Sequence, residues 1–524
     1  MRALMQPLEA IADYKEIKRR LLKNRGVTVI SGTLDAQKAH IASGLAEDFP
    51  VTLIIAENEL KAKGLLEDYR LYDPQVMHYP ARDMIFYQAE ISGSLLTRQR
   101  MQVIKALTER KKVTVITSIG GCMDYLLPFR VLKKDMITLS VGDELDLTEM
   151  SRKLVRIGYE RCGTVEEPGQ FAVRGGILDV YSMTEENPWR IELWGDEIDD
   201  IRMFDSESQR SVTGTEKIVI YPATEDIGID EPDFYKKATD TFLEYLGGRS
   251  IVFLDEPARL MENAKVLYDE FRMAFTHRLE QGKATPEQAE RMISPEQLQY
   301  LLNMRNTVAL CLMQMHKDGF HINGQYSVQV QAVNPYNNQF PLLVKDMQKW
   351  KKNGFRVVFL STSRTRAKRL AGELFQEKIN AFYSEDPERE LQEGEVLVTY
   401  GRSSRGFAYP MQKFVLITES DVFGQSYRPK KKTRKSEGER LRDFSELHAG
   451  DYVIHEDHGL GIYRGIEKVE IDNIIKDYIK VDYAESGSLY LPATQLDMLQ
   501  KYSGAEGKKP KLDRLGGKEW IKTK

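Results

Sequence analysis

The stretch VTVISGTLDAQKAHIASGLAED, residues 27–48, contains the pattern that decides the fold of the N-terminal part of the chain. A β-branched apolar run at 27–31 leads through a Gly-containing turn into residues that suit a helix. Further β-branched runs follow at 51–56, 76–80 and 113–118, separated by helical stretches. This alternation predicts a parallel sheet with crossover helices.

The turn after the first strand resembles a phosphate-binding loop but departs from it at two positions. The pattern G-x-x-x-x-G-K-[ST] needs a strand before it and a helix after it, and Gly32 and Lys38 have the required spacing. Gln37 replaces the second Gly, which lets backbone amides surround a phosphate. Ala39 replaces the hydroxyl that binds magnesium. Taken alone, Gly32 and Lys38 are explained as a chance match.

A later strand supplies the other half of such a site. The run SIVFLDEPARL at 250–260 is apolar and ends in two adjacent acids. In nucleotide sites an Asp at this place holds magnesium, and a following Glu polarises the attacking water. Together the two segments predict an eroded ATP site that does not hydrolyse ATP. Its residues are Gly32, Gln37, Lys38, Ala39, Asp255 and Glu256.

Length and composition narrow the class of protein. The 524 residues exceed one core and predict several domains. With 75 basic and 79 acidic residues, the net charge of −4 favours protein partners, with at most weak nonspecific DNA contact. The sequence contains no apolar run of about 18 residues, so no membrane-spanning helix is predicted. The 3 scattered cysteines form no zinc framework and suit a reducing, cytoplasmic location, so we expect no metal site.

The pattern of apolar and polar residues changes after residue 120. FAVRGGILDVYS (171–182) and WRIELWGDEIDDIRMFD (189–205) alternate apolar and polar residues around Gly turns, which predicts an antiparallel α+β insert. A helix is expected from Glu231 to Leu246. A second small α/β domain is expected from Gln339, and closely spaced strands at the end of the chain predict a small β-barrel.

The insert carries a specific resemblance. Residues 158–182 (GYERCGTVEEPGQFAVRGGILDVYS) and 188–211 (PWRIELWGDEIDDIRMFDSESQRS) resemble the UvrA-binding domain shared by the excision-repair protein UvrB and the transcription-repair coupling factors, the Mfd family. DEPARL (255–260) and the C-terminal part favour the coupling factors. HEDHGLGIYRG (455–465) resembles the Tudor-like barrel that this family shares with CarD regulators.

The resemblance covers essentially the whole chain and implies its domain boundaries. It corresponds to the N-terminal part of the family, without the ATP- and magnesium-dependent motor that follows there, so no cofactor is expected in this chain. The implied parts are a degenerate RecA/helicase-like, UvrB-like α/β module at 1–128 and 218–335, an inserted UvrA-binding domain at 129–217, an additional α/β domain at 339–424, a basic linker at 425–444, an RNA-polymerase-interacting Tudor/SH3-like barrel at 445–505, and the start of a connecting helix at 506–524.

The resemblance also implies contact residues for UvrA. Arg161 and Arg174 stand where the family places arginines that contact UvrA, and the planar guanidinium suits bidentate binding to carboxylates. Gly175–Gly176 would lift Arg174 out of the sheet. Phe171 is a candidate apolar anchor, although we prefer a core position for it. The alternative for each Arg is a solvated surface charge.

For the polymerase, the resemblance implies that an exposed strand of the barrel pairs with the β subunit. Such strand addition needs a free edge. In Tyr478–Tyr483, alternation places Ile479, Val481 and Tyr483 on one side, and core positions are the alternative there. The pair His455 and His458 does not have the spacing of a helical metal site. The candidate polymerase contacts are Ile474, Ile475, Tyr478 and Ile479.

The resulting hypothesis is a monomeric adaptor that docks on stalled RNA polymerase and recruits UvrA. One alternative is a UvrB-like ATPase or helicase that binds damaged DNA. Gln37, Ala39 and the short stretch at 79–100, where UvrB has a long aromatic hairpin, argue against it. A CarD-like transcription regulator is the other alternative.

Overall fold

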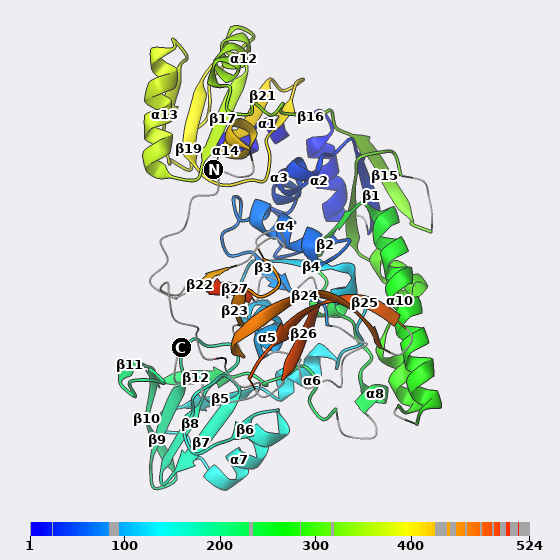
Figure 1. The fold of residues 1–524 in the computed structure, drawn as a ribbon, viewed down its shortest axis with the longest axis vertical. Helices are drawn as coiled ribbons and strands as arrows, with labels where there is room; N and C mark the ends of the chain where they lie inside the picture. The colour runs from blue at the N-terminus through cyan, green and yellow to red at the C-terminus, as the bar shows by residue number, and fades with distance from the viewer. Residues whose placement is uncertain are drawn as a thin grey trace. The chain divides into compact units, whose positions relative to one another are not determined.

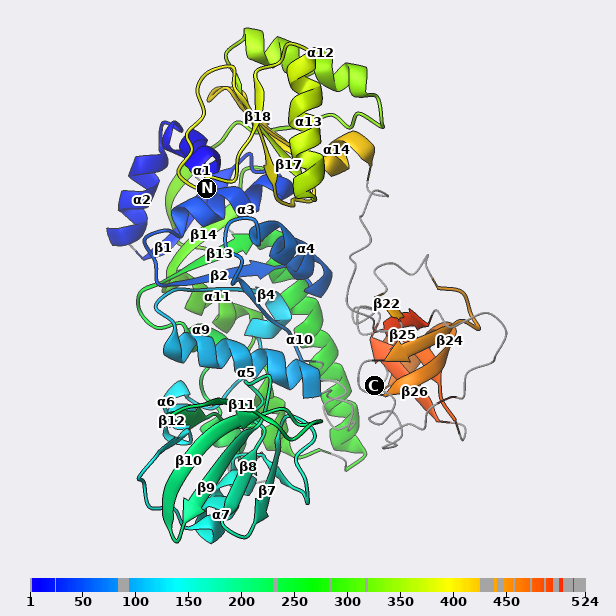
Figure 2. The ribbon, with the colours of Figure 1, turned by 90° about the vertical axis from the view of Figure 1, so that its left-hand side faces the viewer.

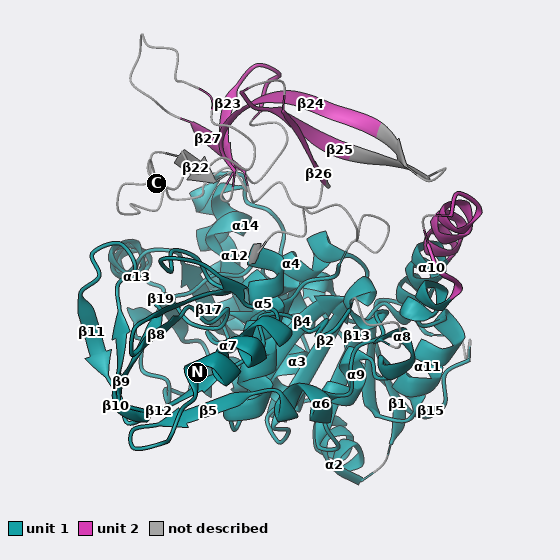
Figure 3. Cartoon of the chain, turned by 90° about the horizontal axis from the view of Figure 1, so that it is seen from below, with its two compact units in different colours: residues 1–268, 287–428 teal, residues 269–286, 429–524 magenta. Residues whose placement is uncertain are grey.

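The computed structural model describes most of the chain as five sheets with their helices (Figure 1). The described residues are 2–23, 25–82, 94–229, 234–282, 284–315, 319–424, 438–440, 447–455, 458–471, 474–484, 487–492, 499–502 and 512. The chain divides into two compact units, one of residues 1–268 and 287–428 and one of residues 269–286 and 429–524 (Figure 3). Most of the predicted linker, and the predicted helix at 506–524 except residue 512, lie outside the described residues.

A seven-stranded parallel sheet forms the centre of the first unit, in the order β15-β1-β14-β13-β2-β4-β3. The parallel sheet predicted from the β-branched runs is therefore confirmed. Its strands are β1 (Gly26–Ser31), β2 (Val51–Ala56), β3 (Met77–Tyr79), β4 (Val113–Ser118), β13 (Ser250–Asp255), β14 (Asn306–Cys311) and β15 (Ile322–Ser327). The accompanying helices are α1 (Arg2–Glu9), α2 (Tyr14–Lys23), α3 (Asp35–Leu45), α4 (Glu59–Tyr69), α5 (Ser94–Glu109), α6 (Phe129–Lys134), α10 (Pro257–Glu280) and α11 (Pro295–Asn303), with short 3₁₀ turns at Ile119–Cys122 and Pro286–Arg291.

The helix predicted from Glu231 to Leu246 is wrong. The described part holds only two short helices, α8 (Phe234–Lys237) and α9 (Phe242–Tyr245). Between them the backbone of Asp240 forms a bridge with Leu126, which takes it out of the helical hydrogen-bond ladder. Thr241 then caps α9 through a capping box with Glu244, so a new helix begins there.

The insert folds as a six-stranded sheet in the order β11-β10-β9-β8-β7-β6, as its alternating pattern predicted (Figure 2). All its pairs are antiparallel except β6 with β7. Its strands are β6 (Glu160–Arg161), β7 (Gln170–Arg174), β8 (Ile177–Val180), β9 (Trp189–Trp194), β10 (Glu197–Phe204) and β11 (Ser211–Gly214). Helix α7 (Leu147–Arg156) accompanies it, and β5 (Ile137–Ser140) pairs with β12 (Lys217–Ile220).

The second α/β domain has a mixed sheet in the order β16-β20-β21-β17-β19-β18. Four strands are parallel, and β20 and β16 are antiparallel additions at one side. Its strands are β16 (Gln331–Ala332), β17 (Arg356–Ser361), β18 (Ala381–Tyr383), β19 (Val396–Tyr400), β20 (Phe407–Tyr409) and β21 (Phe414–Thr418), and its helices are α12 (Phe340–Lys352), α13 (Arg364–Gln376) and α14 (Glu419–Phe423).

The C-terminal strands form one antiparallel sheet in the order β22-β27-β23-β24-β25-β26. Among the described strands no pair joins β22 to β26, so closure into the predicted Tudor/SH3-like barrel stays a prediction. The strands are β22 (Gly438–Arg440), which falls within the predicted linker, β23 (Tyr452–His455), β24 (Gly459–Ile471), β25 (Ile474–Asp482), β26 (Ser488–Pro492) and β27 (Leu499–Tyr502).

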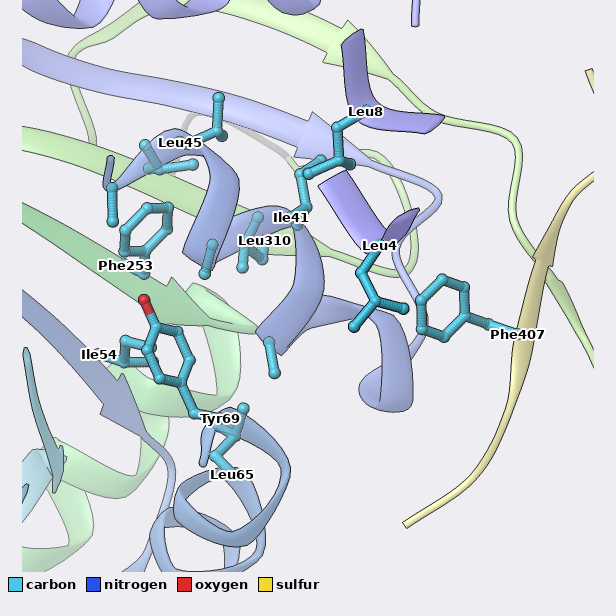
Figure 4. Packing of buried hydrophobic residues seen from close by; sticks show 14 of the residues in the cluster. Leu4, Leu8, Ile41, Leu45, Ile54, Leu65, Tyr69, Phe253, Leu310 and Phe407 are labelled. Carbon is cyan, nitrogen blue, oxygen red and sulfur yellow. The ribbon is translucent and has the colours of Figure 1, made fainter. Parts of the chain in front are cut away.

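The seven-stranded sheet and the second α/β domain share one hydrophobic cluster. It joins residues of α1 and α3 to Phe407, Tyr409 and Phe414 of the second domain. Figure 4 shows Phe407 directed toward Leu4 of α1, beside Ile41 of α3. Because apolar area is removed from water on both sides, the two domains stabilise each other.

Two buried polar side chains form hydrogen bonds between the two domains, one within this shared cluster and one at its rim. His40 in α3 lies 2.6 Å from the carbonyl oxygen of Leu4 through Nε2 and 3.0 Å from the hydroxyl of Tyr409 through Nδ1. Since a carbonyl only accepts, Nε2 carries the proton and Nδ1 accepts from Tyr409. At the rim, Asp68 accepts from the amide of Ser404 at 2.5 Å and from its hydroxyl at 2.7 Å. The loop GRSSRG (401–406) therefore serves as a contact between the domains.

These two groups give the stability of the first unit opposing pH dependences. Burial lowers the pKa of His40 to about 4 and raises the pKa of Asp68 to about 6. The folded chain thus binds fewer protons at His40 than the unfolded chain between pH 6.5 and 4, and loses stability as the pH falls. At Asp68 it binds more protons between pH 4 and 6, and gains stability as the pH falls.

Unfolding measured at pH 7 and pH 5 separates the two contributions. We expect Asp68→Asn to lose stability on acidification more steeply than the unsubstituted chain, by about 1 kcal/mol. We expect His40→Asn to lose it less steeply, by about 2 kcal/mol. The change between the two pH values is the readout, so a constant loss of stability in either variant does not affect the result. Parallel pH profiles for all three proteins would contradict the assignment.

Candidate functional site

Gly32 in the turn after β1, and Gln37, Lys38 and Ala39 at the start of α3, have protein neighbours, whereas Asp35 between them is exposed. Gly32 has φ +80°, and a Cβ added to it would lie 2.2 Å from the carbonyl oxygen of Val328. Val328 in turn donates its amide to the carbonyl of Ser31 at 2.9 Å. The glycine is therefore required by the close approach of the chain after β15, whether or not a phosphate binds.

The two departures from the motif have structural partners. Gln37 is fully buried, and its Nε2 donates to the hydroxyl of Tyr409 at 2.6 Å. With the bond from Tyr409 to His40, this makes a chain of hydrogen bonds that connects α3 to β20. Ala39 is buried in the cluster that joins the two α/β domains. A hydroxyl at that position would face apolar neighbours.

Lys38 is surrounded by carboxylates. Its Nζ lies 2.5 Å from Asp255, 2.7 Å from Glu256 and 3.2 Å from Asp35, and its side chain is 2% exposed. Burial lowers the pKa of Lys38, but the two adjacent acids raise it more, so the net pKa lies above its ordinary value and the ammonium stays charged. Lys38, in the first turn of the helix that follows β1, and the acids at the end of β13 are thus brought together, as the sequence predicted.

Glu256 extends this network to a third strand. Its backbone has φ +56°, which is unfavourable for a residue with a Cβ. Its amide donates to Leu310 at 3.0 Å, and its carboxylate accepts from the amide of Leu312 at 2.9 Å. The bonds to Lys38 and to the end of β14 hold this backbone conformation. One Glu therefore connects the carboxyl ends of β13 and β14 to the first turn of α3.

In the insert, the structure separates the three predicted contact residues. Phe171 is 0% exposed and belongs to the apolar core, so its proposed role as an exposed anchor is wrong and the core interpretation holds. Alternation along β7 explains this. Phe171 pairs with Val180 of β8, so both side chains lie on the same, buried face of the sheet. Arg161 in β6 and Arg174 at the end of β7 are exposed.

Arg174 lies on the opposite, charged face of the insert sheet. Its Nη2 donates to Asp179 at 2.6 Å, and Arg190 donates to the same carboxylate at 2.7 and 2.9 Å. Asp179 is buried, whereas the Arg174 side chain is 45% exposed. The carboxylate, rather than the Gly175–Gly176 turn, therefore determines where the guanidinium lies. No signal in the sequence distinguished Asp179 from other strand acids.

In the C-terminal sheet, Tyr478 and Ile479 are buried, and Ile479 packs with Val481 and Tyr483 in the core of the sheet. Their predicted role as exposed polymerase contacts is therefore wrong in this conformation. The side chains of Ile474 and Ile475 lie outside the described residues. The backbone of Ile474–Asp477 pairs with β24, while β26 pairs only from Tyr478 onward.

The described residues contain neither a candidate metal cluster nor a candidate membrane-spanning helix. Within the ranges given above, no group of three or more His, Cys, Asp or Glu side chains is arranged to hold a metal ion. The rings of His455 and His458 stack with centroids 4.7 Å apart. No helix in the described part of the chain is long and apolar enough to cross a membrane.

Comparisons with known families match two of these regions. Residues 137–225 match the model of the UvrB interaction domain, and residues 447–503 match the model of the CarD-like/TRCF RID domain. The first match covers the insert sheet, and the second covers most of the C-terminal sheet. The two matches thus fall in different compact units of the chain.

Similarity to whole proteins extends along nearly the entire chain. The transcription-repair-coupling factor of Bacillus subtilis is 32% identical over 98% of this chain and 48% of that protein. Those of Staphylococcus haemolyticus and Staphylococcus epidermidis are 28% and 27% identical over 99% and 95% of the chain, respectively. The chain spans about half the length of these curated relatives. It is therefore a homologue, over almost all of its own length, of about half of a transcription-repair-coupling factor, with a UvrB interaction domain and a CarD-like/TRCF RID domain.

Proposed function

We propose that this chain is an adaptor of transcription-coupled repair, which docks on RNA polymerase and recruits UvrA. The observation that carries the proposal is the presence of the two matched domains on separate sheets in separate compact units. Two docking surfaces on independent sheets let one chain hold two partners. The insert sheet would bind UvrA, and the C-terminal sheet would bind the polymerase β subunit, with the chain as a cytoplasmic monomer.

We further propose that the chain itself neither needs a nucleotide nor hydrolyses ATP. A polyphosphate would have to displace Asp255 and Glu256 from Lys38. Lys61, a second cation near the loop, is bound to Asp35 at 2.8 Å. Three carboxylates against two ammonium groups leave a net negative site, which repels phosphate. The buried Ala39 offers no oxygen to magnesium.

For the polymerase, strand addition would use backbone rather than the buried side chains. Strand addition needs unpaired donors and acceptors along one edge. Among the described strands, Ile474–Asp477 of β25 pair on one edge only. This segment retains Ile474 and Ile475 as candidate contacts. In this proposal the C-terminal strands close into a barrel, and any contact of the chain with DNA is weak and nonspecific.

The UvrA surface is tested by reversing the charge of Arg174. We expect Arg174→Glu to weaken binding of purified UvrA at least tenfold, because Glu next to Asp179 repels the carboxylates that the arginine would bind. Binding of RNA polymerase to the same variant should be unchanged. Both affinities are measured by biolayer interferometry on the full chain.

The matched control is Arg369→Glu, which reverses an exposed charge of α13 outside the matched domains. It should bind both partners like the unsubstituted chain. Polymerase binding by the unsubstituted chain, with no UvrA binding at all, would favour a CarD-like regulator over the adaptor. Undiminished UvrA binding by Arg174→Glu would contradict the assigned surface.

The structural role of Lys38 is tested by Lys38→Met. Removing the ammonium leaves Asp255 and Glu256 close together without their cation, and we expect a loss of about 3–5 kcal/mol in the free energy of unfolding. Asp35→Asn should cost less than about 1 kcal/mol, since that carboxylate is 70% exposed. Urea unfolding measures both values.

The same proteins test the nucleotide proposal. ATP with magnesium should leave the melting temperature of the unsubstituted chain unchanged, because a ligand that does not bind the folded state cannot stabilise it. No phosphate should be released with or without DNA. Magnesium-dependent hydrolysis that Lys38→Met abolishes would instead identify a working ATP site.

A further inference from the structure

The tip of the β9–β10 hairpin presents a tryptophan to solvent on a fixed backbone. The Trp194 side chain is 83% exposed. The preceding residue, Leu193, donates its amide to Gly176 at 2.8 Å, and Trp194 pairs with Glu197 across the turn. On the other side, Leu145 donates to the carbonyl of Asp196 at 2.7 Å. The large apolar side chain is thus exposed while the chain beneath it is held from both sides.

Trp194 shares the charged face of the insert sheet with Arg174. In the ladder, Arg174 pairs with Ile177, and Ile177 pairs with Glu192, so these three side chains lie on one face. Trp194 is two residues beyond Glu192 in the same strand, which places it on that face as well. Two neighbouring hairpin tips therefore present an arginine and a tryptophan on the same side.

We propose that Trp194 is the apolar anchor of the surface that binds UvrA, with Arg174 as its charged neighbour. This inference rests on the function proposed above. The partner surface would offer an apolar pocket for the indole and a carboxylate for the guanidinium. Trp and Arg are enriched among the few residues that dominate the binding energy of protein interfaces.

Three observations assign this face to a protein partner. The face lies inside the segment that matches the UvrB interaction domain. The opposite face of the same sheet is already buried, with Phe171, Leu178, Ile191 and Ile201 in its core. The buried Asp179 fixes Arg174 before any partner arrives, and the hydrogen bonds beneath Trp194 fix the tip. Preorganised side chains lose little conformational freedom on binding.

The experiment measures the affinity of purified UvrA for the full chain and for three variants. We expect Trp194→Ala to weaken UvrA binding at least tenfold and Trp194→Phe to weaken it no more than threefold, since Phe retains an aromatic anchor. Val212→Ala removes another exposed apolar side chain, 57% exposed, from the same sheet, and should bind like the unsubstituted chain. RNA polymerase binding should be equal in all four proteins.

Fluorescence supplies a readout that a purely structural role would not change. The difference in emission between the unsubstituted chain and Trp194→Phe isolates Trp194, and we expect it to shift to shorter wavelength when UvrA is added. Equal UvrA affinity of Trp194→Ala and the unsubstituted chain would overturn the inference while leaving the adaptor function intact. Absence of UvrA binding by the unsubstituted chain would overturn both.

Discussion

The ion pairs of Lys38 with Asp255 and Glu256 hold the centre of the first unit together. They join the first turn of α3, which follows β1, to the end of β13, and Glu256 adds the end of β14. In a sheet of parallel strands these carboxyl ends are the usual place for a ligand. Here the charges that a ligand would neutralise are neutralised by each other. A lysine at the position of a phosphate-binding residue thus has a structural use.

The two departures from the phosphate-loop motif, Gln37 and Ala39, also have structural partners. Gln37 binds Tyr409, and Ala39 packs in the cluster shared with the second α/β domain. Phe407 and Tyr409 of that domain, both in β20, contact His40 of α3. The two departures thus both lie at the contact between the two domains. In the insert sheet, Arg174, Asp179 and Trp194 lie on the same face.

Periodicity in the sequence predicted the elements well and the exposed side chains less well. The β-branched runs located β1, β2 and β4, and the spacing of the loop and of Asp255 predicted that their residues meet. The same alternation already placed Ile479 with Val481 and Tyr483, and the structure confirms that this face is core. Phe171 follows the same rule. The broken helix near Asp240 depends on a pairing with Leu126, more than 100 residues away, which local periodicity cannot report. The sequence analysis did not single out Trp194. Its signal was present, since a Trp next to the Gly of a predicted hairpin turn lies at the tip of that hairpin.

The adaptor account requires that both partners bind one chain at the same time and without nucleotide. Mass photometry of the chain mixed with UvrA and RNA polymerase, in buffer without ATP, tests this requirement directly. The account predicts a species whose mass is the sum of the chain and both partners. A mixture of separate binary complexes only, or a joint complex that forms solely when ATP is added, would contradict it.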